Sequence, residues 1–461
     1  MYDFGLVGLG VMGRNFILNV ADNNFSAIGL DLDSEKVDSL KTEGEGRVVT
    51  ATSDKSEFIS QLKTPRKIML LVPAGGPVDA VINDLKPLLD KGDIIIDGGN
   101  SFFTDTDRRF EELAKDGIHF FGSGVSGGAK GARKGPSIMP GGDKEAYEHI
   151  RPIFEAASAK VNGEPCVAHL GNGSAGNYVK MVHNGIEYAM MQMISEVYHV
   201  LKNGRKYDNE QLHQLFDSWN KSELESFLVE ITAEIFNQKD DLTDGDLVDQ
   251  ILDKAKQKGT GKWTSQNAMD LGMPIPAVDV SVSMRQISAF KDQRLQAESI
   301  FGGNDQTVAI TDQEMKEALF LAFILSYAQG FAQLRQASKD YGYGLDMEVI
   351  SKIWRGGCII RSALLEDFRK AFDANPDIEN ILLSDIISEK VKPLIYSLQK
   401  VVSTSLGAGY AVPALSASLN YLLSYKTGRL PLNLIQAQRD HFGSHTYERL
   451  DREGIFHTEW E

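Results

Sequence analysis

Short apolar runs alternate with amphipathic segments through the first part of the chain. An apolar run at residues 2–7 leads into closely spaced glycines, and helical spacing of apolar positions follows at residues 14–21. The same order recurs, and repeated strand–helix units are typical of a parallel sheet covered by helices on both faces. The apolar runs predict strands at residues 2–7, 26–31, 67–72, 93–97 and 119–121.

The spacing of apolar positions changes after the glycine-rich segment at residues 171–176. Long helical periods follow it, and a polar, charged stretch ends the chain. A glycine cluster at a change of pattern is a typical domain boundary. We therefore predict an α/β, Rossmann-like doubly wound domain at residues 1–174, a large all-α domain at 175–435, and an extended C-terminal tail at 436–461.

A glycine turn joins the first predicted strand to the first predicted helix. Its residues are Gly8, Leu9, Gly10, Val11, Met12 and Gly13. The first two glycines permit a tight turn and close approach of a pyrophosphate, the third lets the helix pack on the strand, and the helix N-terminus faces the phosphates. This position, after a strand and before a helix, predicts a dinucleotide site.

Two further loops are expected at carboxyl ends of strands, where open α/β sheets bind ligands. One is the segment 97–101, which contains Asn100, and the other is the glycine-rich segment 122–128. Successive backbone N–H groups in such a loop form a nest suited to a carboxylate. Two purely structural turns are the alternative. Residues 130–142 are interpreted as another loop with solvated charges.

A stripe of polar side chains follows the domain boundary. Lys180, His183, Asn184, Glu187 and Tyr188 fall at i, i+3, i+4, i+7 and i+8, which places them on one face of a helix. The helix continues into apolar residues that indicate burial. A base, an acid and hydrogen-bonding groups on a buried helix are costly unless they form a site, although a solvated polar face remains the alternative.

Charge and composition restrict the partners. The 48 basic and 64 acidic residues give a net charge of −16, which disfavours nucleic acid and anionic membranes as partners. Any anionic ligand must therefore be held by a local cationic cluster. Two cysteines give no disulfide framework, and no signal peptide is indicated at the start, so we expect a cytoplasmic protein.

Neither a membrane span nor a metal site is predicted. The uncharged segments 318–334 and 401–425 are interrupted by polar residues or glycines, and they are interpreted as buried helices of a soluble protein. His441 and His445 have a spacing that could suit a metal. No HExxH motif and no nearby cysteine or carboxylate pattern accompanies them.

The segment 180–188, KMVHNGIEY, closely resembles the signature of decarboxylating 6-phosphogluconate dehydrogenases, and the resemblance covers nearly the whole chain. It implies NAD(P)-dependent conversion of 6-phospho-D-gluconate to D-ribulose 5-phosphate and CO₂ in the pentose phosphate pathway, with Lys180 as base and Glu187 as acid. The implied substrate contacts are Asn100, Ser126, Gly127, Gly128, His183 and Asn184, with Tyr188, Lys258 and Arg285 at the phosphate. Arg439 and His445 would enter from the tail of a partner in a homodimer.

The cofactor site departs from the family pattern. The family has an Asn-Arg pair that grips the NADP phosphate, where this chain has Asp31, Leu32 and Asp33. The family's lysine near the cofactor is also missing from the segment that ends in Pro73, Ala74 and Gly75. A carboxylate accepts hydrogen bonds from a ribose 2′-hydroxyl and repels a 2′-phosphate. We therefore predict that NAD⁺ is favoured over NADP⁺, unless Ser34 and a distant basic residue rescue phosphate binding.

Two other functions remain open. A β-hydroxyacid dehydrogenase acting on a non-phosphorylated 3-hydroxy acid shares the nucleotide domain, the lysine and the glycine loop. It would not need Lys258, Arg285, Arg439 or His445 and is typically shorter. A non-catalytic NAD-binding scaffold is the second alternative, and the intact pair of Lys180 and Glu187 argues against it.

Overall fold

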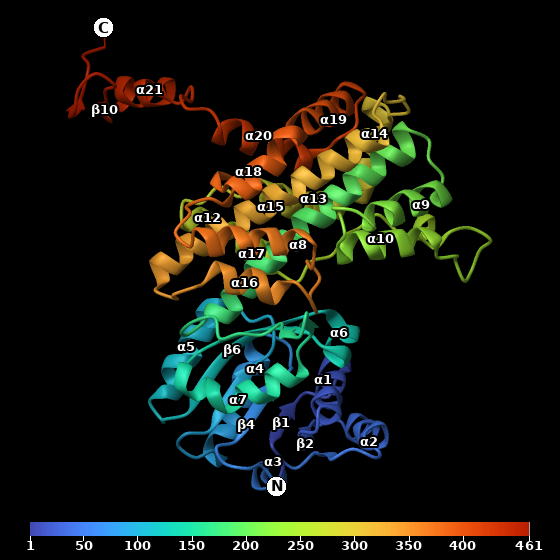
Figure 1. The fold of residues 1–461 in the computed structure, drawn as a ribbon, viewed down its shortest axis with the longest axis vertical. Coiled ribbons are helices and arrows are strands. Elements are labelled where there is room, and N and C mark those ends of the chain that lie inside the picture. The colour runs from blue at the N-terminus through green and yellow to red at the C-terminus, as the bar shows by residue number, and fades with distance from the viewer. Residues whose placement is uncertain (461) are drawn as a thin grey trace.

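The computed structural model describes residues 1–460 and divides them into a sheet region, a helical region and a projecting tail (Figure 1). The sheet region contains strands β1 (Phe4–Val7), β2 (Ala27–Leu30), β3 (Val49–Thr52), β4 (Lys67–Leu70), β5 (Ile94–Asp97), β6 (His119–Ser126) and β7 (Ser137–Gly141). Its helices are α1 (Val11–Asp22), α2 (Ser34–Glu43), α3 (Lys55–Ser60), α4 (Gly76–Leu85), α5 (Phe103–Ala114), α6 (Gly128–Lys134) and α7 (Lys144–Ala157). A small hairpin, β8 (Lys160–Val161) and β9 (Glu164–Pro165), follows them.

The sheet has the strand order β3-β2-β1-β4-β5-β6-β7. All neighbouring strands are parallel except β6 and β7, which are antiparallel. Successive side chains of a strand point to opposite faces, so Ile94 and Ile96 join the core under α1 and α7, and Ile95 joins the core under α3 and α4. The predicted doubly wound domain is confirmed.

Three details of the prediction are wrong. Strand β3 was not predicted, and residues 122–126 of the expected glycine loop at 122–128 form the second half of β6. The expected loop at 130–142 forms part of α6 and all of the buried strand β7, although Lys130 and Lys134 are exposed as expected. Glycine is a poor strand former, and β7 contains a proline, so local composition indicated loops where pairing with neighbours produces strands.

Helices account for the second region. They are α8 (Ala175–His199), α9 (Asn209–Asn220), α10 (Phe227–Asn237), α11 (Leu247–Gln250), α12 (Thr260–Asp270), α13 (Pro276–Ser288), α14 (Lys291–Phe301), α15 (Asp312–Tyr341), α16 (Met347–Trp354), α17 (Leu364–Ala374), α18 (Asp385–Val391), α19 (Ile395–Gly407) and α20 (Pro413–Tyr425). Helix α15 is long and apolar enough to cross a membrane, but 94% of its apolar window is buried inside the chain. It is the core helix that the sequence predicts at 318–334, and it packs against α8 and α19.

The tail consists of α21 (Asn433–Gly443) and the hairpin β10 (Tyr447–Glu448) and β11 (Ile455–Phe456). It extends from the end of α20, on the side of the helical region farthest from the sheet (Figure 1). Asp440 is fully buried within it and accepts hydrogen bonds from the backbone of Thr446 and Thr458 and from the side chains of His457 and Trp460. These contacts close the tail into a small unit of its own.

Helix α20 is capped by a residue from a distant part of the chain. Its N-terminus has no side-chain cap of its own, and the Glu196 carboxylate of α8 accepts the N–H groups of Ala414 (2.8 Å) and Leu415 (3.0 Å). Glu196 is only 3% exposed, and burial raises its pKa to about 7. The cap therefore carries a desolvation cost when it is ionised.

Glu196→Gln should change how stability depends on pH. Because the pKa of Glu196 is raised on folding, its contribution to the free energy of unfolding is greatest below pH 4.5, its ordinary pKa. The contribution falls as pH rises and levels off above about 7. Urea titrations from pH 4.5 to 7.5 should show the wild type losing up to about 3 kcal/mol relative to Glu196→Gln. The exposed Glu210→Gln variant should follow the wild type, and parallel curves for all three proteins would contradict the expectation.

Candidate active site

Helix α8 crosses β6 at very short range. A Cβ atom at Gly124 would lie 2.3 Å from Cβ of Lys180, and one at Gly122 would lie 2.0 Å from Oδ1 of Asn177. Any side chain at either position would push α8 off the sheet. The sequence pattern assigns the glycines of this segment to a ligand-binding loop, but Gly122 and Gly124 allow close packing of α8 on β6. This packing fixes the distance of Lys180 from the strand.

The polar stripe of α8 is buried, which excludes a solvated face. Lys180 is 5% exposed and His183 is fully buried, while the side chain of Glu187 keeps 20% exposure. Burial lowers the pKa of Lys180 against the opposing effect of Glu187. Burial also raises the pKa of Glu187 against the charges of Lys180 and Arg285. The environment thus favours the neutral forms of a potential base and a potential acid.

His183 is held as a neutral imidazole by a directed chain of hydrogen bonds. Its Nε2 lies 3.3 Å from Oγ of Ser126, which accepts the backbone N–H of Ile359. Its Nδ1 lies 3.0 Å from Oδ1 of Asn184, whose amide donates to Oγ1 of Thr260. The amide oxygen can only accept, so Nδ1 carries the proton and Nε2 accepts from Ser126. Burial lowers the pKa of His183 well below its ordinary value, in keeping with this neutral form.

A cleft of about 690 Å³ opens beside this arrangement. It lies at the carboxyl ends of the central strands, and its wall includes Val125, the neighbour of Gly124, which packs on Lys180. Residues predicted for cofactor and for substrate share its lining, which includes Met12, Pro73, Ala74, Gly75, Asn100 and Lys258. The sequence did not single out Phe102 and Trp263, which also line the cleft and pack together with ring centroids 4.9 Å apart and ring planes tilted by 39°.

Tyr188 and Arg285 meet on the substrate side. The Arg285 guanidinium carbon lies 3.4 Å from the centroid of the Tyr188 ring, and its Nη1 donates to the carbonyl of Lys256, two residues before Lys258. Gly261 makes room for the ring, since a Cβ there would lie 2.4 Å from it. Arg285 therefore brings one cation to this side of the site, while Lys258 lines the cleft and is exposed.

The glycine turn has the shape expected for a phosphate cradle. Gly8 has φ +97°, and a Cβ there would lie 2.6 Å from the carbonyl of Leu71, while a Cβ at Gly13 would lie 1.9 Å from the carbonyl of Gly8. A Cβ at Gly10 would meet nothing within 4 Å. Helix α1 has no side-chain cap and no acidic residue in its first turn, so its N–H groups are free to receive a phosphate.

Asp31 lies on a second cleft of about 430 Å³ at the other end of this turn. Its Oδ2 accepts the N–H of Leu9 (2.7 Å) and its Oδ1 the N–H of Asp33 (3.0 Å). Lys36 lies 3.7 Å from Asp31 and 3.5 Å from Asp33, a basic neighbour that the sequence did not single out. Leu32 is 92% exposed.

Arg439 and His445 are not brought to this site within one chain. Both are exposed on the tail, and Arg439 donates a hydrogen bond to its neighbour Gln436. The tail lies beyond the helical region, far from α5 and β6 (Figure 1). Within residues 1–460 there is no group of three or more His, Cys, Asp or Glu side chains that could hold a metal ion.

Comparison with known proteins identifies the family. Residues 3–171 match the model described as the NAD binding domain of 6-phosphogluconate dehydrogenase, and residues 176–460 match the model of its C-terminal domain. A curated protein of Bacillus subtilis, "6-phosphogluconate dehydrogenase, NADP(+)-dependent, decarboxylating", is 51% identical over 99% of this chain and 98% of its own length. The corresponding Escherichia coli K12 protein, "6-phosphogluconate dehydrogenase, decarboxylating", is 49% identical with the same coverage.

The chain belongs to the decarboxylating 6-phosphogluconate dehydrogenase family. A solved 6-phosphogluconate dehydrogenase of Plasmodium falciparum, described with NADP⁺ and with 6-phosphogluconate, has the same fold, with a TM-score of 0.96, 43% identity and coverage of 99% of this chain and 100% of its own. Matches of this length decide between the hypotheses drawn from the sequence, because they favour the phosphorylated substrate over a shorter β-hydroxyacid dehydrogenase. The protein is an NAD(P)-binding oxidoreductase of the pentose phosphate pathway.

Proposed function

We propose that Lys180 and Glu187 are the base and acid that convert 6-phospho-D-gluconate to D-ribulose 5-phosphate and CO₂. The observation that carries this proposal is that both groups lie on one largely buried face of α8, where Lys180 packs on Gly124 beside Val125 in the wall of the large cleft. A free lysine is about 99.9% protonated near pH 7. Burial lowers the pKa of Lys180, which increases the fraction available as a base.

Proton movements follow from these two positions. Neutral Lys180 Nζ takes the proton of the C3 hydroxyl as C3 is oxidised to a ketone. The resulting ammonium donates to the ketone oxygen while the C1–C2 bond breaks; its electron pair forms the C2=C3 double bond of an enediol, and CO₂ leaves. Glu187 then protonates C2, which becomes C1 of the product, and Lys180 recovers the proton from the C3 oxygen. The ketone itself is the electron sink, so the chain's own acid and base suffice for decarboxylation.

The remaining site residues orient the substrate. Ser126, Gly127, Gly128 and Asn100 would bind the carboxylate and hydroxyl end, together with neutral His183 and Asn184. Tyr188, Lys258 and Arg285 would bind the phosphate, since Arg and Lys supply the charge-assisted hydrogen bonds that phosphate requires. The meeting of Arg285 and Tyr188 beside the Lys256 carbonyl supports this assignment.

The glycine turn and the segments at 31–33, 73–75 and 100 would hold the dinucleotide. The open space at Gly10 and the uncapped start of α1 fit a pyrophosphate. A bound nicotinamide supplies the hydride acceptor for C3. Met12, Pro73, Ala74 and Asn100, which line the large cleft, would hold the nicotinamide ring beside the substrate.

The adenosine end favours NAD⁺. Asp31 keeps acceptor capacity for a ribose hydroxyl, and Asp33, Asp54 and Asp84 lie near it. The two cations there are already paired, Lys36 with Asp31 and Asp33, and Lys55 with Asp84. A 2′-phosphate would therefore add charge to a predominantly acidic surface.

Parallel assays with 6-phosphogluconate test this preference together with the reaction. We expect kcat/KM for NAD⁺ to exceed that for NADP⁺ by about tenfold or more, which corresponds to about 1.4 kcal/mol, with one CO₂ released per reduced cofactor. Leu32→Arg should move the ratio toward NADP⁺, because the exposed side chain can reach a 2′-phosphate without repacking. A clear NADP⁺ preference of the wild type would overturn the cofactor proposal and leave the substrate proposal standing.

We also propose a cytoplasmic homodimer in which the tail completes the partner's phosphate site. The tail exposes Leu434 (61%), Ile435 (52%) and Phe442 (73%), more apolar surface than a small free-standing segment normally leaves uncovered. A second copy covering this surface would bring Arg439 and His445 to a site that they cannot reach in their own chain.

A further inference from the structure

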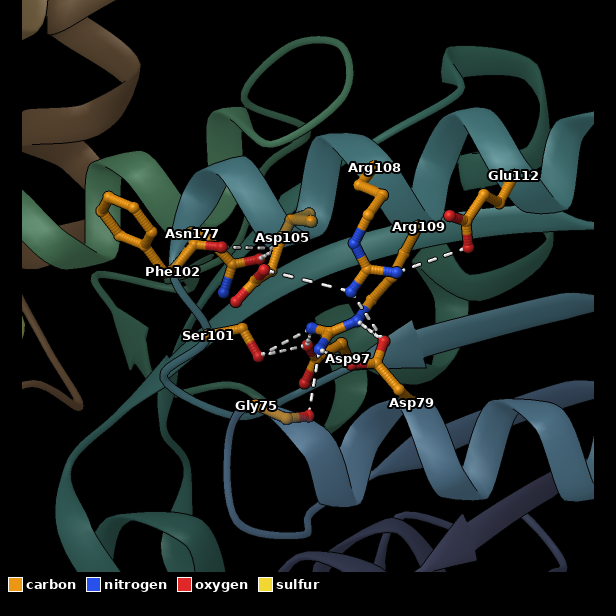
Figure 2. Close-up of polar contacts among 11 residues, drawn as sticks. Gly75, Asp79, Asp97, Ser101, Phe102, Asp105, Arg108, Arg109, Glu112 and Asn177 are labelled. Carbon is orange, nitrogen blue, oxygen red and sulfur yellow. Dashed lines mark hydrogen bonds and ion pairs between the residues drawn. The ribbon is translucent and has the colours of Figure 1, made fainter.

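Arg109 of α5 is a buried cation that joins the two segments lining the large cleft. It is 1% exposed, and Figure 2 shows its guanidinium between α4 and the loop after β5. Its Nε and Nη2 donate to Oδ1 (2.7 Å) and Oδ2 (3.1 Å) of Asp79, and Nη2 also donates to the carbonyl of Gly75 (3.0 Å). On the other side, Nη1 lies 3.4 Å from Oγ of Ser101 and 3.5 Å from Oδ2 of Asp97.

Both ends of this bridge belong to the cleft. Gly75 ends the segment 71–75, which lines one wall, and Asp97 and Ser101 flank the segment 98–100, which lines another. Asp97 is fully buried and accepts the N–H of Gly99 (3.0 Å) and the hydroxyl of Ser101 (2.6 Å). A single guanidinium therefore fixes the spacing between the two segments.

The same network reaches the helix that carries Lys180. Asn177, one helical turn before Lys180, donates to the carbonyl of Gly99 (3.3 Å) and accepts from Oγ1 of Thr106 (3.0 Å). The segment 98–100 is thus held between Asp97 on one side and α8 on the other. Any shift of Asp97 would be transmitted to Asn100 and to its position relative to Lys180.

Charge explains why an arginine is needed. Burial raises the pKa of Asp97, and Arg109 opposes that shift. Removing the guanidinium would withdraw one of the contacts that favour ionised Asp97, and protonation would turn one of the oxygens that now accept from Gly99 and Ser101 into a donor. Hydrogen bonds from Arg109 and Arg108 lower the pKa of Asp79 to about 2, so Asp79 provides an ionised partner for the guanidinium.

We propose that Arg109 is a positioning residue that sets the separation of segments 71–75 and 98–101 and so orients the nicotinamide end of the cofactor against Lys180. The inference rests on the proposed function, and it concerns a buried residue that does not itself line the large cleft. A misplacement of about 1 Å at a reacting centre can cost about 10²-fold in rate. The expected defect therefore falls mainly on kcat, with a smaller loss of cofactor affinity.

Arg109→Ala, with guanidinium rescue, tests the proposal. A cavity of about 60 Å³ lined by Asp79, Arg108 and Arg109 gives small cations access from outside. We expect kcat to fall about 10²-fold and the cofactor Kd, titrated directly without substrate, to rise about tenfold, while KM for 6-phosphogluconate changes less than threefold. Guanidinium chloride at low millimolar concentration should restore kcat at least about tenfold, and sodium chloride at equal ionic strength should not.

Arg108→Ala is the matched control. Arg108 is the neighbouring arginine and also donates to Asp79, but its side chain is 44% exposed and contacts neither cleft segment. The kcat and KM of Arg108→Ala should therefore stay within twofold of the wild-type values and should not respond to guanidinium. If Arg109→Ala does not fold, Asp79→Asn, which loosens the guanidinium, should lower kcat about tenfold. Wild-type kinetics in a folded Arg109→Ala protein, or in Asp79→Asn, would overturn the proposal. Failure of the proposed reaction would appear as a wild type that does not oxidise 6-phosphogluconate. The Arg109 proposal can still be tested in that case, because the cofactor Kd is titrated without substrate.

Discussion

Lys180→Met is expected to lower kcat at least about 10³-fold and to suppress cofactor reduction and CO₂ release together. The methionine stem can occupy the space that Gly124 leaves for Lys180, so the substitution removes the amine without displacing α8. General acid–base catalysis by a positioned group contributes about 10²–10⁴-fold, and Lys180 is proposed to act in both steps. Loss of both products in parallel distinguishes a shared base from a group that serves decarboxylation alone.

The measurement is a single-turnover assay that follows reduced cofactor and CO₂ in the same sample. In the wild type, kcat/KM should rise with pH through the lowered pKa of Lys180, because only the neutral amine accepts the C3 proton. Lys130→Met, which alters an exposed lysine of α6, should behave as the wild type. Turnover of Lys180→Met within tenfold of wild type would remove the base assignment.

The pattern of apolar and polar positions predicted the strands that are apolar throughout. It also predicted the helices whose polar residues recur at helical spacing. It failed at the second half of β6 and at β7, where glycine and proline make the local composition unfavourable for a strand. Gly122 and Gly124 lie in a strand because they pair with β7, and their missing side chains leave the space that α8 occupies. The local sequence pattern of β6 therefore could not predict its full length, because the deciding contacts come from other elements.

The candidate site shows the same limit. Helical spacing alone places Lys180, His183 and Glu187 on one face, so this part of the site was predictable. Arg109 was not, because nothing in its local sequence distinguishes it from Arg108, although one is buried between two carboxylates and the other is exposed. A buried arginine becomes recognisable only when the partners that neutralise it are in place.

Mixed dimers should recover activity that neither parent has. In a shared-site homodimer, Lys180→Met and a tail variant carrying Arg439→Ala with His445→Ala damage different subunits' contributions to one site. A heterodimer then contains one site with both defects and one intact site. Random reassociation makes half of the dimers heterodimers, so the mixture should reach about a quarter of wild-type activity.

A matched mixture excludes recovery by simple stabilisation. Lys180 and Glu187 lie on the same helix, so mixing Lys180→Met with Glu187→Gln leaves every site with one defect and should restore nothing. Differently tagged chains allow each heterodimer to be purified before assay. Recovery to about a quarter of wild-type activity in the first mixture and none in the second would place Arg439 and His445 in the partner's site. The exposed position of the tail in the single chain leads us to expect this result. An inactive, purified heterodimer of the first pair would show that each chain builds its site alone.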